Sequence, residues 1–380
     1  MIHDMKIGGY VAEGFEGVAD AFAASLVAGD DLGATFSVVQ DGETLVDLYG
    51  GVRDASGSEP LGPDDLFNVW STTKGLCALC LAMAVDRGLI DYEAPVSRYW
   101  PEYGVNGKES ISVETLVSHR GGITGAYTPA TYDDMSDNRA YAARLAAQAP
   151  LYEVGGQSAY NAGILGLWVN ELLLRTDGRS VAQFFHEDVA RPLDVDVWIS
   201  LPEEHHHRRA PMIAPWARMA EAMPLPTDPV VRASMSNPRM NPLRSNDPDW
   251  MVRGNGSADG SANARGLARI YGALARGGEI DGVRLISPEG LAKATAQRSG
   301  GKDIVFTIYT RWAAGFLLNN RGLYGPCDDA FGHTGLGGSF AFADPQRKLG
   351  ISYAMNLMAA NLMGDQRGAR LVAATYAALS

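Results

Sequence analysis

Two pairs of strand-like segments, one near each end of the chain, most constrain the fold that this sequence can adopt. The stretch "TFSVVQDGETLVDLYGGV" places strand-forming residues on both sides of Asp41-Gly42, a dipeptide typical of a tight hairpin. The stretch "GSFAFADPQRKLGISYAMNLM" repeats this pattern around Asp344-Pro345. Helical stretches flank the two pairs, namely "GFEGVADAFAASLVAGDD" and "DQRGARLVAATYAALS". Because mostly helical sequence lies between them, we expect both ends of the chain to build one antiparallel sheet.

This arrangement predicts an α+β protein in which an antiparallel sheet flanked by helices is joined to a mostly helical lobe. We expect residues 1–84 and 252–380 to form a discontinuous α/β lobe, and residues 85–251 to form the helical lobe. Residues 210–251 interleave prolines with methionines, a composition that prevents long regular elements. This segment either forms a lid or one wall of an apolar pocket, or packs as an arm on the body or on a neighbouring subunit.

Charge and hydrophobicity exclude several classes of partner. The formal net charge of −12 would repel phosphate backbones and anionic lipids, so neither nucleic acid nor membrane partners are expected. The N-terminus, "MIHDMKIGGYVAEGFEGVAD", lacks the basic start, apolar stretch and cleavage site of a signal peptide. The longest apolar run, near Leu76–Val85, is far shorter than the roughly 20 residues that span a bilayer. These features predict a cytoplasmic protein, which could form a homo-oligomer.

No cofactor or metal site is predicted. Cys77 and Cys80 form a C-x-x-C, but no second pair accompanies them and both lie in an apolar helical run, which favours small buried residues. The odd total of three cysteines favours reduced thiols over disulfides. His205, His206 and His207 could suggest a metal, but successive side chains point in different directions and the flanking charges indicate a solvated loop.

The polar pair Ser71 and Lys74 opens the apolar run in "FNVWSTTKGLCALCLAMAVDRGLI". At positions i and i+3 of a helix, the two side chains lie on one face about one turn apart. Burial of this helix would lower the pKa of Lys74, which could then act as a neutral base toward the Ser71 hydroxyl. The Ser71 N–H and the helix dipole would face a developing oxyanion. The spacing alone is a weak signal, because "SGGK" at Ser299–Lys302 repeats it in a predicted glycine loop.

A second motif, His333-Thr334-Gly335, stands directly before a predicted strand in "FGHTGLGGSFAFAD". Serine β-lactamases and penicillin-binding proteins combine S-x-x-K with a K-T-G-like element. The backbone N–H of Leu336 could supply a second oxyanion donor at the strand edge, and the glycines would let substrate approach the backbone. His119, in "SHRGG", lies beside a predicted turn and is interpreted as structural.

Four segments in this order and spacing resemble the class C β-lactamase-like serine hydrolases, and most closely the family VIII carboxylesterases. They are "VWSTTKGLCALCLAMAVDRGLIDYEAPVSRYWPEY", "SVETLVSHRGGITG", "SAYNAGILGLWVNELLLRTDGRSVAQFFHEDVARPL" and "FGHTGLGGSFAFADPQRKLGISYAMN". The resemblance covers the chain from about Thr35 to Asn356. It implies a β-lactamase/transpeptidase-like fold, with the active site in the crevice between the sheet-containing lobe and the helical lobe.

The resemblance also implies roles for individual residues. Ser71 would be the nucleophile and Lys74 its base partner. Tyr160, in "SAYNAG", would pass the proton to the leaving group and help to activate the deacylating water. Tyr127, in "GGITGAY", would reach the substrate pocket. The backbone amides of Ser71 and Leu336 would form the oxyanion hole.

Two departures from the class C pattern bear on the substrate. The family's Tyr-x-Asn is here Tyr160-Asn161-Ala162, so the amide that binds the β-lactam side chain is not at its usual position. His333 replaces a lysine, and a histidine with a pKa of about 6.5 is mostly neutral at pH 7, whereas a lysine would be a permanent cation for the β-lactam carboxylate. Both changes favour neutral esters over anionic lactams, although some D-alanyl carboxypeptidases of this fold also carry His-Thr-Gly.

We therefore expect a serine carboxylesterase that hydrolyses short-chain carboxylic esters through an acyl-enzyme on Ser71, with Lys74 and Tyr160 as general acid and base. Weak β-lactam hydrolysis is compatible with this site. The alternatives are a β-lactamase or D-amino-acid peptidase, an acyltransferase, and a β-lactam-binding sensor that is acylated without turnover. A small-molecule ester would contact the tyrosine and the second motif, namely Tyr127, His333, Thr334 and Gly335.

Overall fold

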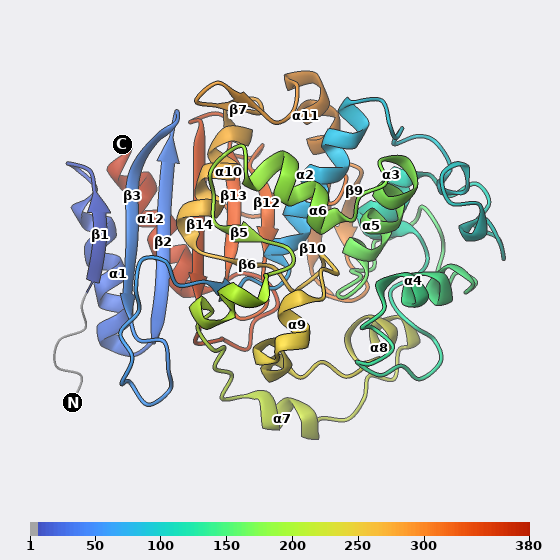
Figure 1. Ribbon diagram of the computed structural model, residues 1–380, viewed down its shortest axis with the longest axis horizontal. Helices are drawn as coiled ribbons and strands as arrows, with labels where there is room; N and C mark the ends of the chain where they lie inside the picture. The colour runs from blue at the N-terminus through green and yellow to red at the C-terminus, as the bar shows by residue number, and fades with distance from the viewer. Residues whose placement is uncertain (1–6) are drawn as a thin grey trace.

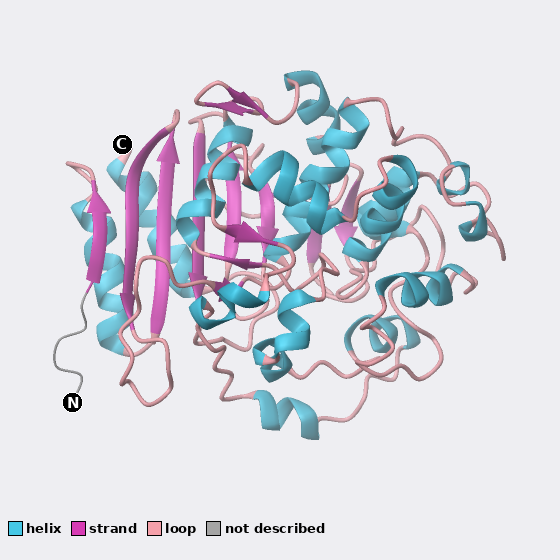
Figure 2. Ribbon diagram, in the orientation of Figure 1, coloured by secondary structure: helices cyan, strands magenta, loops and turns pink. Residues whose placement is uncertain are grey.

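The two terminal hairpins meet in one large sheet, which confirms the predicted α+β class (Figures 1 and 2). The computed structural model describes residues 7–380; residues 1–6, part of the predicted α/β lobe and of the stretch tested for a signal peptide, lie outside the described residues. The strands of this sheet are β1 (Ile7–Val11), β2 (Gly33–Gln40), β3 (Glu43–Gly51), β9 (Ser299–Lys302), β10 (Tyr309–Trp312), β11 (Leu317–Leu318), β12 (Phe331–Thr334), β13 (Phe340–Asp344) and β14 (Leu349–Met355). Within residues 7–380 they form a nine-stranded sheet in the order β1-β3-β2-β14-β13-β12-β11-β10-β9, with every neighbour antiparallel.

Turn chemistry explains both predicted hairpins. Asp41 and Gly42, between β2 and β3, have φ angles of +48° and +97°, which is the left-handed geometry that Asp-Gly favours in two-residue hairpins. Between β13 and β14, the Asp344 carboxylate accepts the backbone N–H groups of Gln346 and Arg347 at 2.9 and 3.1 Å. β14 then pairs with β2, which joins the two ends of the chain.

Helices cover both faces of the sheet, as Figure 1 shows. α1 (Glu16–Ala28) and α12 (Gln366–Ala378) pack together on one face, and α10 (Ala264–Ala275) and α2 (Thr72–Asp86) cover the other, α2 beside β12. The central strands β13 and β14 are consequently buried along their whole length. α2 is buried on every side from Thr72 to Ala84, as its apolar sequence predicts.

The remaining elements are short. The helices between α2 and α10 are η1 (Val96–Arg98), η2 (Pro101–Tyr103), α3 (Val113–Thr115), η3 (Leu116–Arg120), α4 (Asn138–Ala146), α5 (Leu165–Thr176), α6 (Val181–Phe185), η4 (His186–Ala190), η5 (Glu203–Arg208), α7 (Ala217–Ala222), α8 (Pro229–Met235), η6 (Pro242–Asn246) and α9 (Pro248–Val252). β4 (Phe67–Asn68), β6 (Ser261–Ala262) and β5 (Val197–Trp198) form a three-stranded sheet, and β7 (Glu279–Ile280) and β8 (Val283–Arg284) a hairpin before α11 (Pro288–Thr295). In the part of the chain from residue 7 onward, no helix combines the length and apolarity needed to cross a bilayer. The boundaries proposed between the two lobes stay a prediction.

Candidate active site

Ser71 stands at a sharp turn between β4 and the first turn of α2. The preceding residue, Trp70, has a φ of +50°, a left-handed conformation that is strained for a bulky side chain. The ring of Trp70 is buried and packs against that of Trp250, with 5.5 Å between the ring centroids. This packing fixes the turn. Within residues 65–84, Ser71 is partly accessible and the other residues are buried.

Three side chains meet at the Ser71 hydroxyl. Lys74 Nζ lies 2.9 Å from Ser71 Oγ, and the Tyr160 hydroxyl lies 2.7 Å from the same oxygen. Lys74 comes from the next position on the same face of α2, because residues i and i+3 of a helix are neighbours. Tyr160 comes from the loop that precedes α5. The structure thus brings together Ser71, Lys74 and Tyr160, the three residues that the sequence analysis predicts to be catalytic.

Lys74 is completely buried among backbone acceptors. Its Nζ also donates to the carbonyl oxygens of Ala162 at 2.6 Å and Ser257 at 2.7 Å. Burial, the largest cause, lowers the pKa of Lys74 to about 7. A neutral amine has two N–H groups and one lone pair. With its N–H groups on the two carbonyls, the lone pair is left to face Ser71, so Lys74 can accept the hydroxyl proton.

Tyr160 is 4% exposed and is held by both its ring and its backbone. The ring stacks on Phe306 and Trp312, with centroid separations of 4.4 and 5.8 Å. The Tyr160 N–H donates to Asp303 at 3.2 Å, and its carbonyl accepts the Ser234 hydroxyl at 2.6 Å. Burial raises the pKa of Tyr160, so its hydroxyl keeps its proton at neutral pH and can serve as a donor.

His333 is buried beside this group, with 6.2 Å between its ring and that of Tyr160. Its Nδ1 lies 2.7 Å from the Thr334 carbonyl oxygen, which can only accept, so Nδ1 carries the proton. Burial, together with the nearby charge of Lys74, lowers the pKa of His333 to about 3. The second motif therefore presents a neutral imidazole near Tyr160 and Lys74.

The turn after β12 packs against the start of α2. The Ser339 hydroxyl donates to the Val69 carbonyl at 2.8 Å, and a side chain at Gly335 would collide with that same carbonyl. The Gly338 N–H donates to the Gly335 carbonyl at 3.2 Å, which closes a four-residue turn in which Gly337 has a φ of +88°. This is the position at which a type II turn requires positive φ. Leu336 occupies the preceding corner, where the N–H is not used by the turn.

Within residues 7–380, the N–H groups of Ser71 and Leu336 donate to no acceptor. One stands at the start of α2 and the other on the turn that packs beside it. Two unpaired donors on adjoining segments suit a developing oxyanion. The assignment of these amides to an oxyanion hole, and of Thr334 and Gly335 to substrate binding, stays a prediction.

The contacts of Tyr127 do not support its predicted role in substrate binding. Its hydroxyl donates to the carbonyl oxygens of Ala149 at 2.7 Å and Gly122 at 3.3 Å, and in the described structure no hydrogen bond joins it to Ser71, Lys74 or Tyr160. The predicted role of Tyr127 in the substrate pocket stays a prediction.

Sequence reasoning missed several groups that shape the site. His119, interpreted only as structural, is buried with its ring 5.0 Å from that of Tyr160, and its Nδ1 accepts the Asn161 N–H at 3.3 Å. The carbonyl groups of Ala162 and Ser257 that hold Lys74 carry no side-chain signature at all. Only the position of Ala162 in the Tyr160 motif could have pointed to it.

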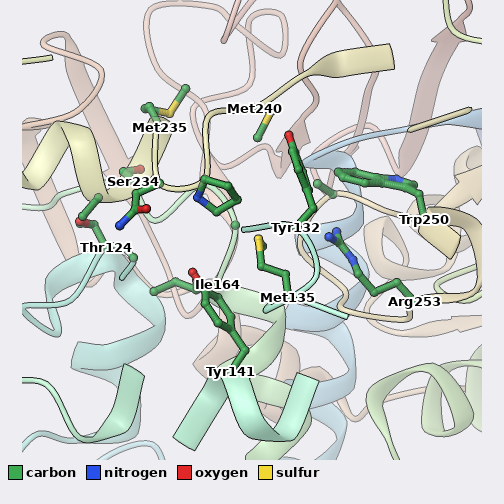
Figure 3. A pocket seen from close by; sticks show the side chains of 16 residues that line it. Thr124, Tyr132, Met135, Tyr141, Ile164, Ser234, Met235, Met240, Trp250 and Arg253 are labelled. Carbon is green, nitrogen blue, oxygen red and sulfur yellow. The ribbon is translucent and has the colours of Figure 1, made fainter. Parts of the chain in front are cut away.

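Residues 210–251 form one wall of a small apolar cavity of about 40 Å³ (Figure 3). Met235 and Met240 face Met135 and Ile164 across it. Ser234, on the same wall, is the residue that donates to the Tyr160 carbonyl. Ser234 thus links this wall to Tyr160, and the functional role of residues 210–251 stays a prediction.

A serine that contacts a buried lysine and a buried tyrosine at the head of an apolar helix defines a serine hydrolase of the S-x-x-K class. The model of the Beta-lactamase family matches residues 18–375, and the chain belongs to this family.

Comparisons with individual proteins agree with this assignment. The Esterase/beta-lactamase LipL of Mycobacterium tuberculosis is 33% identical over 379 residues, which cover 93% of this chain and 84% of that protein. The crystal structure of a family VIII carboxylesterase superposes with a TM-score of 0.93 at 41% identity, covering 98% of this chain and 100% of the other. A penicillin-binding protein homologue from Caulobacter crescentus gives 0.92 at 39% identity, with the same coverage. The resemblance to family VIII carboxylesterases is confirmed, and the protein is a serine hydrolase.

Proposed function

We propose that this protein is a carboxylesterase that hydrolyses short-chain carboxylic esters through an acyl-enzyme on Ser71. One observation carries the proposal: Ser71 Oγ lies 2.9 Å from Lys74 Nζ and 2.7 Å from the Tyr160 hydroxyl. The similarity to a family VIII carboxylesterase and to LipL, which is named an esterase, supports esters as the substrate class.

The pKa values of Lys74 and Tyr160 indicate which of the two accepts a proton and which donates one. With a pKa of about 7, Lys74 is neutral in a large fraction of molecules at physiological pH, whereas burial keeps Tyr160 protonated. Lys74 therefore takes the Ser71 proton while Oγ attacks the ester carbonyl. The N–H groups of Ser71 and Leu336 hold the negative oxygen of the tetrahedral intermediate.

The intermediate then collapses by breaking the bond to the alcohol oxygen. Tyr160 gives its proton to the departing alkoxide and regains one from the Lys74 ammonium group. In the second half-reaction, the same groups deprotonate a water that attacks the acyl carbon, and Ser71 recovers its proton. The cycle consumes one water and releases an alcohol and a carboxylic acid.

The neutral imidazole of His333 favours uncharged substrates, because no cation stands there to bind a carboxylate. β-Lactam hydrolysis is a second candidate, since LipL is named both an esterase and a beta-lactamase. A chromogenic cephalosporin assayed beside a chromogenic ester separates the two: a higher kcat/KM for the ester supports the first, and the reverse order supports the second.

The test of the acyl-enzyme uses a fluorophosphonate and an activated acetyl or butyryl ester. We expect the fluorophosphonate to label Ser71, as detected by peptide mass analysis, and to stop ester turnover. Ser71→Ala should abolish turnover, while Ser299→Ala, in the second S-x-x-K segment, should leave it unchanged. Turnover that persists in Ser71→Ala, or labelling at another serine, contradicts the proposal.

A further inference from the structure

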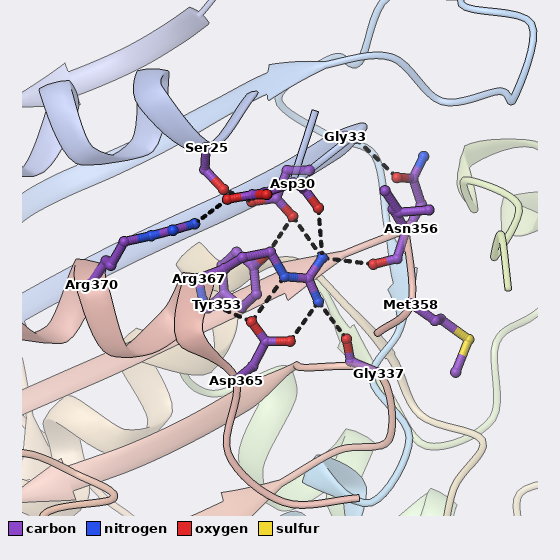
Figure 4. Close-up of polar contacts among 12 residues, drawn as sticks. Ser25, Asp30, Gly33, Gly337, Tyr353, Asn356, Met358, Asp365, Arg367 and Arg370 are labelled. Atoms are coloured by element: carbon purple, nitrogen blue, oxygen red, sulfur yellow. Dashed lines mark hydrogen bonds and ion pairs between the residues drawn. The ribbon is translucent and has the colours of Figure 1, made fainter. Parts of the chain in front are cut away.

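The turn that carries Leu336 is fixed from behind by a buried arginine, Arg367 of α12 (Figure 4). Arg367 Nη2 donates to the Gly337 carbonyl oxygen at 2.6 Å. The Ala359 N–H donates to the same oxygen at 3.0 Å, and the Gly337 N–H donates to the Asn361 carbonyl at 3.2 Å. The peptide groups next to Leu336 are thus held by partners from outside the turn.

Arg367 is itself held on every side and is only 6% exposed. Its Nε and Nη2 donate to the two carboxylate oxygens of Asp365 at 2.9 and 2.7 Å. Its Nη1 donates to Asp31 at 3.0 Å and to the Leu357 carbonyl at 2.8 Å. A buried cation is tolerated when paired and hydrogen-bonded in this way, and the planar fork fixes several groups at once.

The turn needs such an external anchor because of its composition. Gly335, Gly337 and Gly338 flank Leu336 on both sides, and glycine has more backbone freedom than any other residue. An oxyanion donor contributes most when its N–H is already aimed at the position of the developing charge, and small displacements lower the rate.

We propose that Arg367 is a positioning residue for the oxyanion hole: through the Gly337 carbonyl it fixes the turn that aims the Leu336 N–H at the substrate carbonyl bound at Ser71. The inference rests on the proposed function, because an oxyanion forms only if an acyl group is transferred to Ser71. Arg367 would thus influence the rate of ester hydrolysis although it does not contact the reacting atoms.

The experiment compares kcat/KM for an oxygen ester and for the matching thiono ester, whose C=S sulfur is larger and accepts hydrogen bonds poorly. An intact oxyanion hole makes the wild-type protein prefer the oxygen ester. We expect Arg367→Lys to lower kcat/KM for the oxygen ester by about tenfold or more, short of the 10²–10³-fold loss typical of deleting a donor, and to change the thiono ester far less. The ratio of the two values therefore falls, which a merely structural defect would not cause.

Arg370→Gln is the matched control, because Arg370 lies one turn further along α12 and pairs with Asp30 at the surface. Arg367→Lys retains a cation between the two carboxylates, so it should fold; Asp365→Asn, which keeps Arg367 but loosens it, provides a second variant with the same expected direction. A folded variant of either kind with the wild-type oxygen-to-thiono ratio, or an equal fall in Arg370→Gln, overturns the positioning role while ester hydrolysis stands. A wild-type protein that hydrolyses neither ester and leaves Ser71 unlabelled overturns the proposed function, and the positioning role with it.

Discussion

The chain contains the spacing Ser-x-x-Lys twice, and the two copies differ in every property that matters for catalysis. Ser71 and Lys74 lie on one face of a buried helix with Nζ and Oγ 2.9 Å apart. Ser299–Lys302, which the sequence placed in a glycine loop, forms the edge strand β9 and pairs with β10. In a strand, residues i and i+3 point to opposite faces, so this serine and lysine cannot meet.

Burial separates the two copies further. Lys74 is enclosed and its pKa falls to about 7, whereas Lys302 is exposed to solvent at the sheet edge. The spacing alone therefore neither brings the lysine to the serine nor lowers the pKa of the lysine. A helix must place the two groups together, and the interior of the protein must desolvate the amine.

Replacing each lysine in turn should give the largest difference in activity between the two copies of the motif. Lys74→Met removes the proposed base, and we expect kcat/KM for a short-chain ester to fall by about 10²–10⁴-fold. Lys302→Met is the matched control and should retain wild-type activity, since its side chain is exposed. Initial rates, with thermal unfolding to establish that both variants fold, provide the measurement. Equal activity in the two variants would remove Lys74 from the mechanism.

The two tyrosines give the next largest contrast. Tyr160→Phe removes the hydroxyl 2.7 Å from Ser71 Oγ, so kcat should fall by about 10²-fold through loss of the proton donor. Tyr127→Phe removes a hydroxyl bonded to backbone carbonyls, and its kcat and KM should stay within about twofold of wild type. If Tyr127→Phe instead raises KM severalfold, the substrate-binding role predicted from the sequence is correct.

The sequence predicted the main lines of the fold because local chemistry specified them. Asp41-Gly42 favours a tight hairpin. Apolar residues lie on every face of the helical stretch Leu76–Val85, which therefore has to be buried. Ser71 and Lys74 needed only the helical period to be placed together. Tyr160 came instead from the family resemblance, since nothing in its neighbours reveals that it reaches Ser71.

The groups that tune the site could not be predicted, because they act through backbone atoms or across long sequence separations. The carbonyl groups that hold Lys74 belong to Ala162 and Ser257, whose residue types are chemically uninformative there. Arg367 reaches the Leu336 turn from the last helix, and no motif links the two. SGGK was misplaced because its glycines indicate a loop, whereas pairing with β10 stabilises the strand.

The pH dependence tests the environment of Lys74 directly. The proposed mechanism needs a neutral Lys74, and burial lowers the pKa of Lys74 to about 7, so kcat/KM should rise about tenfold per pH unit below pH 7 and level off above it. His333, with a pKa of about 3, does not titrate in this range. Lys302→Met should show the same profile. A rate that keeps rising to pH 10 would mean that Lys74 has the pKa of an exposed lysine.

A smaller effect on the pH profile is expected from a charge placed near Lys74, because such a charge should shift the pKa of Lys74. In His333→Lys, a cation replaces a neutral ring 6.2 Å from that of Tyr160, and repulsion between like charges should lower the pKa of Lys74. We expect the midpoint of the kcat/KM profile to move about one pH unit lower. His333→Gln places a polar but uncharged side chain at the same position and should leave the midpoint near pH 7. If the two variants share one midpoint, position 333 has no electrostatic influence on the base, and the neutral histidine of the second motif must be explained by substrate binding alone.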